Sequence, residues 1–200
     1  KRLLPAHNLE YDNGKITISK YWNYPKKTIN TNFENAKEEY NEIFQEAVKI
    51  RMRSDVPVGT TLSSGLDSSS IVSVLRKFFS NEHKTFTAKF DKGDYKKSEK
   101  QLYKEDIEID EAKLVARLSK DLSLNAHFIE IRDENFISQL NNNIYYLESG
   151  HASPATIPLS NILNYAKDHV TVVMEGQGAD ELLGGYISSA FPFFILDNLK

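Results

Sequence analysis

Apolar positions along the chain change their spacing several times, and these changes predict the order of strands and helices. Short β-branched and apolar runs predict buried strands, whereas apolar residues three and four apart predict helices that bury one face. The strands are expected at 56–62, 84–90, 125–131 and 170–174, and the helices at 71–79, 110–118, 134–147 and 154–169. This alternation predicts an α/β fold with a doubly wound, mostly parallel sheet and helices on both faces.

The start of the chain follows a different pattern. Asn13-Gly14, between two extended segments, is the strongest short signal of a two-stranded hairpin. The pattern then changes to a helical one, so we expect a boundary near residues 25–31. The hairpin would belong to residues 1–24, and one larger domain would occupy residues 25–200.

Two local features concern a helix start and a long connection. A helical stripe begins at Phe33, and Thr31 with Glu34 has the spacing of a capping box. The polar stretch at 91–109 is too long and too charged for a tight turn. We therefore expect a mobile loop there.

The composition is that of an ordinary globular protein. The 200 residues carry a net charge of −3, which gives no sign of a nucleic-acid-binding surface. No apolar run is as long as a membrane span. The absence of cysteine excludes disulfides, thiolate metal sites and a cysteine nucleophile within these residues. Because the chain starts at Lys1 without methionine, we expect a piece of a longer, cytoplasmic protein that contacts neither nucleic acid nor membrane.

A serine-rich loop with a single carboxylate follows the first strand of the predicted sheet. Its sequence is "SSGLDSSS", residues 63–70. In such sheets ligands bind beyond the carboxyl ends of the strands, and small residues at a helix start offer N–H and O–H donors to an anion. Asp67 would repel a phosphate unless a cation lies between them, so the loop predicts Mg²⁺ together with phosphate. A simpler interpretation is that Asp67 or Ser68 caps the helix.

A second unusual loop follows the strand at 170–174. In "MEGQGADELLGGY", residues 174–186, Gly176 and Gly178 allow close approach of the backbone, and Asp180 places a second carboxylate at a strand end. Because both loops lie at the same edge of the sheet, the two carboxylates predict a shared metal and phosphate centre. The alternative is a helix start whose acidic residues complement the helix dipole.

The two loops, taken with their flanking residues, resemble those of a known enzyme family. "SDVPVGTTLSSGLDSSSI" and "VVMEGQGADELLGGY" resemble the pyrophosphate loop (S-G-G-L-D-S-S) and the G-E-G-A-D-E-L-F-G-G-Y segment of the glutamine-dependent asparagine synthetases. "DEAKLVARL" resembles the family's D-E-x-x-x-A helix, and residues 3–22 resemble the junction between its glutaminase and synthetase domains. The resemblance spans nearly the whole chain and implies an adenine nucleotide alpha-hydrolase-like fold, preceded by a short hairpin.

The resemblance also implies roles for residues of both loops. Asp67 and Asp180 would hold Mg²⁺, and these two residues with Gln177 would be catalytic. ATP would be bound through its phosphates by the first loop and through its adenine by the strand ends, at Leu62, Ser63, Ser64, Gly65, Leu66, Asp67, Ser68, Ser69, Ala88, Glu175 and Gly176. Two positions depart from the family pattern, because Ser64 stands where glycine is commonest and Gln177 where many members carry glutamate. If that glutamate is a base, Gln177 cannot replace it.

The reaction that the resemblance implies is ATP-dependent amide formation. Aspartate would become asparagine through a β-aspartyl-AMP intermediate, with ammonia released from glutamine by a glutaminase domain of which residues 1–24 are the tail. Two alternatives remain: a related ATP-dependent amidotransferase or amide-forming cyclase acting on another carboxylate, and a non-catalytic ATP-binding module. The chain alone is expected to be incomplete at its C-terminus and inactive, and a homodimer is a further expectation for the complete enzyme.

Overall fold

The computed structural model describes most of the chain in two compact units. It describes residues 2–25, 28–79, 83–90, 111–132, 136–148, 153, 155–186, 192 and 195, so the predicted loop at 91–109 lies outside the described residues. One unit covers Lys1–Glu42 and the other Ile43–Lys200. Among the described residues, every buried apolar side chain belongs to the second unit. The hydrophobic core is therefore that of the second unit.

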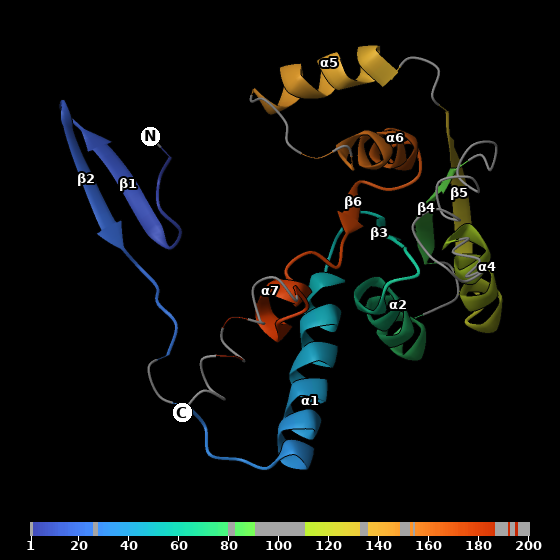
Figure 1. Cartoon of the computed structure of the whole chain (residues 1–200), viewed down its shortest axis with the longest axis horizontal. Coiled ribbons are helices and arrows are strands. Elements are labelled where there is room, and N and C mark those ends of the chain that lie inside the picture. Colours follow the sequence, from blue (N-terminus) through green and yellow to red (C-terminus); the bar gives the residue numbers. More distant parts are fainter. Residues whose placement is uncertain are drawn as a thin grey trace. The chain divides into compact units, whose positions relative to one another are not determined.

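The first unit contains an antiparallel hairpin, as the sequence predicts. Strand β1, His7–Asp12, pairs along its whole length with β2, Lys15–Lys20 (Figure 1). The two-residue turn places Asn13 at φ 46° and Gly14 at φ 83°, in the left-handed region that a tight hairpin turn requires. Apolar side chains of both strands are exposed, and a two-stranded ribbon is marginally stable by itself. The shape of the hairpin therefore comes from local turn chemistry and not from a core.

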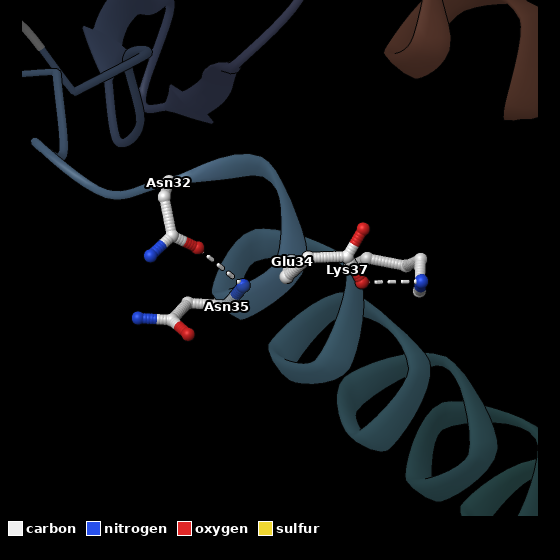
Figure 2. A network of polar contacts seen from close by, with 4 residues as sticks. All are labelled: Asn32, Glu34, Asn35 and Lys37. Carbon is white, nitrogen blue, oxygen red and sulfur yellow. Dashed lines mark hydrogen bonds and ion pairs between the residues drawn. The ribbon is translucent and has the colours of Figure 1, made fainter.

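Helix α1, Phe33–Arg51, begins with a cap that differs from the predicted one. Asn32 is the capping residue, because its Oδ1 accepts a backbone N–H of the first turn at 2.8 Å (Figure 2). The carboxylate of Glu34 pairs with Lys37 at 2.6 Å and does not complete a capping box (Figure 2). The predicted box of Thr31 with Glu34 is therefore wrong. Asparagine caps a helix as well as serine or threonine does, and it stands one residue closer to the helix.

The second unit is built on a four-stranded sheet. Its strands are β3 (Val58–Thr61), β4 (Lys84–Phe90), β5 (Asn125–Ile131) and β6 (Val172–Met174). They lie in the order β5-β4-β3-β6, and every neighbouring pair is parallel. The four predicted strands and their parallel arrangement are confirmed. Strand β6 begins two residues later than predicted, because the N–H of Val170 still bonds to Ala166 at the end of the preceding helix.

Helices cover both faces of this sheet. They are α2 (Leu66–Phe78) and α4 (Glu111–Asp121) on one face and α6 (Thr156–Ala166) on the other, with α5 (Phe136–Leu147) packed on α6. Val48 of α1 packs against α2 and Met174, and the short α7 (Ala179–Leu183) follows β6. Leu62, Val72 and Val115 form the core on the face of α2 and α4, and Phe86 with Ile162 on the face of α6. Figure 1 shows α2 and α4 on one side of the strands and α5 and α6 on the other. The doubly wound α/β fold is therefore confirmed.

The chain reverses its direction across the sheet beside β3. From β3 it passes through α2 to β4 and through α4 to β5, and then returns past α5 and α6 to add β6 on the other side of β3. At such a reversal the loops leaving the two adjacent strands turn apart and leave a crevice at their carboxyl ends. The two loops singled out in the sequence follow these two strands, β3 and β6. In the part of the chain that the structure describes, no helix is both long and apolar enough to cross a membrane.

Candidate functional site

A cavity of about 730 Å³ lies at the carboxyl edge of the sheet. Helices that connect parallel strands run back against them, so the starts of α2, α4 and α6 reach this edge. These helix starts form the cavity wall together with α7, which follows β6, and with the ends of β3, β4 and β6. Ten of the residues predicted from the sequence lie on the wall: Leu62, Ser63, Gly65, Asp67, Ser68, Ala88, Glu175, Gly176, Gln177 and Asp180.

The start of α2 brings Asp67 to the cavity. Gly65 holds the N-cap position with φ −67° and ψ 154°, and no side chain caps the helix. The simpler interpretation, in which Asp67 or Ser68 is the cap, is therefore wrong. Asp67 is the second residue of the helix and half-buried, where the helix dipole stabilises a carboxylate. Ser64 is not among the residues with positive φ, so its side chain is accommodated without backbone strain.

Hydrogen bonds within the first loop hold its backbone in one shape. The buried hydroxyl of Ser68 accepts the N–H of Ser63 at 3.1 Å, and Ser63 Oγ accepts the N–H of Gly65 at 3.1 Å. The two hydroxyl oxygens also lie 2.9 Å apart. Short polar side chains therefore satisfy backbone groups that a longer or apolar side chain would leave unpaired.

The second loop touches the first through a glycine. A Cβ atom added to Gly176 would lie 3.0 Å from Cβ of Asp67 and 3.2 Å from the backbone nitrogen of Ser68, closer than side chains normally pack. Glycine is therefore the residue that allows the two strand-end loops to meet. Gly178 precedes α7 at φ +98°, in the left-handed region that favours glycine. This turn directs the chain into the short helix that carries Asp180.

The charges of three carboxylates raise the pKa of Tyr186, which lies on the cavity wall. Its hydroxyl donates to Glu181 Oε1 at 3.4 Å. The charge of Glu181 is the main cause that raises the pKa of Tyr186. Desolvation, the charges of Asp180 and Asp67, and the hydrogen bond itself act in the same direction. Gly185 packs directly on Asp180, since an added Cβ would overlap its carboxylate. Asp67 and Asp180, from different strand ends, line the same cavity as this phenol.

These side chains have the chemistry that magnesium requires. Mg²⁺ prefers oxygen ligands and is commonly held by one or two carboxylates together with phosphate oxygens. Among the residues with described positions, no group of three or more histidine, cysteine, aspartate or glutamate side chains forms a metal site. Asp67 and Asp180 are therefore suited to a cation that arrives with phosphate, and less suited to one held by protein ligands alone.

The opposite part of the cavity wall is apolar. Aromatic and aliphatic side chains from β4 and from the first half of α6 line it: Phe86, Ala88, Phe90, Pro158, Leu159 and Ile162. A planar base can lie against such a wall while its phosphates reach the serine loop, because small-molecule sites combine apolar walls with a few polar groups that fix orientation. The cavity therefore fits a nucleotide better than it fits a small anion alone.

Three residues predicted to contact ATP are not on the cavity wall. Leu66 is 81% exposed, and Ser69 lies in the first turn of α2, where its N–H bonds to Gly65. Ser64 donates from its N–H and from its hydroxyl to Glu111 Oε1, at 3.2 Å and 3.4 Å. Ser64 therefore connects the loop to a wall residue of α4.

Some wall residues could not be named from the sequence. Glu111, Ser153, Tyr186 and the first residues of α6 line the cavity. One signal could have found most of them. In a predicted parallel sheet, the first turn of each connecting helix reaches the carboxyl edge. Glu111 is the first residue of such a helix.

Similar proteins are found by family, by sequence and by structure. A family profile described as asparagine synthase matches residues 39–195. The chain is 35% identical over 173 residues to glutamine-hydrolyzing asparagine synthetase 1 of Bacillus subtilis, with 86% of the chain and 25% of that protein covered. A Methanocaldococcus jannaschii protein of the same family name is 31% identical over 191 residues, with 94% and 34% covered. The NH3-dependent NAD synthetase of Campylobacter jejuni aligns with a TM-score of 0.45 and 19% identity, over 78% of this chain and 61% of that one. The chain thus spans a quarter to a third of the length of these two sequence relatives.

Proposed function

The chain belongs to the asparagine synthase family, and we propose that from about residue 25 onwards it forms the ATP-binding synthetase part of an amide-forming enzyme. The substrates are aspartate, ATP and ammonia, and the products are asparagine, AMP and pyrophosphate. Ammonia comes from glutamine in a separate glutaminase domain, of which residues 1–24 are the tail. The observation that carries the proposal is the contact of Gly176 with Asp67, which joins the two carboxylate-bearing loops at one cavity.

The reaction requires activation because the oxygen of a carboxylate is a poor leaving group. In the first step, an aspartate carboxylate oxygen attacks the α-phosphorus of ATP, and the bond from this phosphorus to the bridging oxygen breaks. Pyrophosphate leaves with the bonding electrons, and β-aspartyl-AMP remains. In the second step, ammonia attacks the acyl carbon, AMP departs with its oxygen, and the nitrogen releases a proton. The protein contributes positioning and stabilisation of the developing charge.

The first loop stabilises the leaving pyrophosphate. Ser63 and Ser68 lie on the cavity wall, where their hydroxyl oxygens accept the backbone N–H groups of Gly65 and Ser63. The hydroxyl protons and the backbone N–H groups at the start of α2 would be the donors to the leaving pyrophosphate. They add to the positive end of the helix dipole, which favours the negative charge that pyrophosphate gains as it leaves. Asp67 and Asp180 would hold magnesium, which when bound would neutralise phosphate charge as a Lewis acid.

In this proposal Gln177 binds the substrate by hydrogen bonding and does not transfer a proton. It lies on the cavity wall between two glycines, and its amide can donate and accept hydrogen bonds but does not titrate near neutral pH. We assign to it a hydrogen bond to the substrate or the acyl intermediate. The proton that ammonia releases is then taken by another group or by the departing phosphate.

Analysis of the products tests the proposed function. An enzyme that carries this chain is incubated with ATP, Mg²⁺, aspartate and ammonium, and AMP, ADP and asparagine are quantified. AMP and asparagine should appear in equal amounts, and both should disappear when aspartate is omitted. ADP in place of AMP would contradict the proposal. AMP formation with a different carboxylate only would indicate a related amidotransferase or cyclase, and ATP binding without turnover of any carboxylate would indicate a non-catalytic module.

A further inference from the structure

Three consecutive backbone N–H groups of the first loop are each bonded to a side-chain oxygen. The N–H of Ser63 bonds to Ser68 Oγ at 3.1 Å, and that of Gly65 to Ser63 Oγ at 3.1 Å. The N–H between them, of Ser64, bonds to Glu111 Oε1 at 3.2 Å. Two of the three acceptors are neutral hydroxyls, whose protons rotate to suit a neighbour. The third is a carboxylate.

Glu111 takes more than one donor from the loop. Its Oε1 also lies 3.4 Å from the hydroxyl of Ser64, so one charged oxygen faces two donors of the same residue. Glu111 is the half-buried first residue of α4, and it lies on the wall of the cavity together with Ser63, Gly65 and Asp67. A negatively charged group therefore accepts hydrogen bonds from donors of the loop that is expected to bind a phosphate.

We propose that Glu111 is an internal competitor for the phosphate, a residue that holds the Ser64 donors until an anion displaces it and so sets the anion affinity of the loop. This inference rests on the proposed function, since it assumes that the loop binds phosphate. Two anions cannot share one set of donors without a cation between them, because both their charges and their hydrogen-bond requirements conflict. Pyrophosphate binding must therefore break the contact of Glu111 with Ser64.

A purely structural tether would behave in the opposite way. If the Glu111 contact only held the loop in its binding shape, its loss would loosen the loop and weaken pyrophosphate binding. If Glu111 competes, removal of its charge strengthens binding. The difference should be largest without divalent cations, because a cation reduces the repulsion between the carboxylate and the phosphate. The sign of the effect and its dependence on Mg²⁺ separate the two roles.

The experiment is a calorimetric titration of an enzyme that carries this chain with inorganic pyrophosphate, in EDTA and in Mg²⁺. Glu111→Gln keeps the size of the side chain and removes its charge, and it should bind pyrophosphate about tenfold more tightly than the wild type in EDTA. Ser64→Ala removes only the weaker hydroxyl contact and should give a smaller gain. Glu181→Gln is the matched control, because it removes a charge from the same cavity wall but has no contact with the loop donors in the structure. Melting temperatures establish that each variant is folded.

The outcomes separate this inference from the proposed function. Tighter binding by Glu111→Gln, with little change in Glu181→Gln, supports the competitor role. Equal or weaker binding by Glu111→Gln, or an equal gain in Glu181→Gln, overturns the competitor role while the phosphate site stands. If neither the wild type nor any variant binds pyrophosphate, even with Mg²⁺, the proposed function fails and the inference fails with it.

Discussion

The two loops that meet at the cavity are stabilised in different ways. The loop after β3 is held by side-chain oxygens of Ser63, Ser68 and Glu111, and it leads into the 13-residue helix α2. The loop after β6 relies on glycines, with Gly176 in close contact and Gly178 in the left-handed region, and it leads into the five-residue helix α7. The first arrangement fixes the direction of hydrogen-bond donors. The second fixes how closely a carboxylate can approach those donors.

Removing a carboxylate from either loop should have the largest effect. Asp67→Asn and Asp180→Asn should each lower pyrophosphate release by the complete enzyme about 100- to 1,000-fold, because in the proposed site each carboxylate would hold the cation at the leaving group. The measurement is pyrophosphate release over a range of Mg²⁺ concentrations. Asp168→Asn, an exposed carboxylate away from the cavity wall, is the control. Retained activity in one of the two variants would show that the loops do not share a cation.

The loops should also differ in what they contribute to stability. Ser68→Ala deprives the N–H of Ser63 of its acceptor in a buried setting, and we expect a loss of about 2 kcal/mol in the free energy of unfolding. Gln177→Ala changes an exposed side chain of the other loop and should alter this free energy by less than about 0.5 kcal/mol. Urea denaturation measures both values. Equal losses would contradict the distinction between a hydrogen-bonded loop and a glycine-shaped one.

Close approach of the second loop can be tested at its glycine. In Gly176→Ala the new methyl group pushes against Asp67, so binding of Mg-pyrophosphate should weaken by about tenfold. Gly178→Ala adds a methyl group with no neighbour within 4 Å but at φ +98°, so it should cost stability, by about 1–2 kcal/mol, more than affinity. Calorimetric titration and thermal melting distinguish the two effects. Unchanged affinity in Gly176→Ala would show that the contact of the loops is not required.

The neutral amide of the second loop should have a smaller effect on the reaction. Gln177→Glu introduces a titrating group at the cavity wall, so the rate should change several-fold and acquire a new dependence on pH. The pH profile of asparagine formation from pH 5 to 9 measures this. An unchanged rate and profile would show that the position makes no contact with the reacting groups.

The smallest of the expected effects is a loss of stability at acid pH, where a histidine next to β3 and β4 becomes protonated. His83 Nε2 lies 2.7 Å from Thr60 Oγ1, and burial lowers the pKa of His83 below 6.5. As the pH falls below about 6.5, the unfolded chain binds the proton first, so folding loses stability until the native histidine is protonated as well. We expect a loss of less than about 1 kcal/mol between pH 7.5 and pH 5, measured by urea denaturation. His83→Gln should show a flatter curve, and parallel curves would exclude His83 as the titrating group.

Local signals in the sequence were sufficient for most elements. Asn13-Gly14 predicted the hairpin turn, because few other residues adopt the geometry of a tight turn. The β-branched and apolar runs predicted the bounds of β4 and β5. The cap of α1 was missed because Thr31 and Asn32 are adjacent and both are good caps. Which of them is used depends on the path of the chain before the helix.

The site was predictable only where it depends on strand ends. Asp67 and Asp180 follow β3 and β6, so the topology of a doubly wound sheet was enough to place them at one edge. The contact of Glu111 with Ser64 joins residues 47 positions apart, and the wall formed by α6 depends on how this helix packs on β4. No local pattern encodes such contacts, because they arise from the packing of whole elements.

The central place of β3 affects the order in which the protein can fold. Gly59 pairs with Lys84, 25 residues further along the chain, whereas Val58 pairs with Val172, 114 residues further. Closing the longer loop costs more conformational entropy before any contact compensates for it, and contacts between distant residues slow folding. The serine loop should therefore form early, and the glycine loop should join it only when β6 docks. In a refolding experiment, pyrophosphate binding should recover after the helical circular dichroism signal, so ligand binding would report the final step of folding.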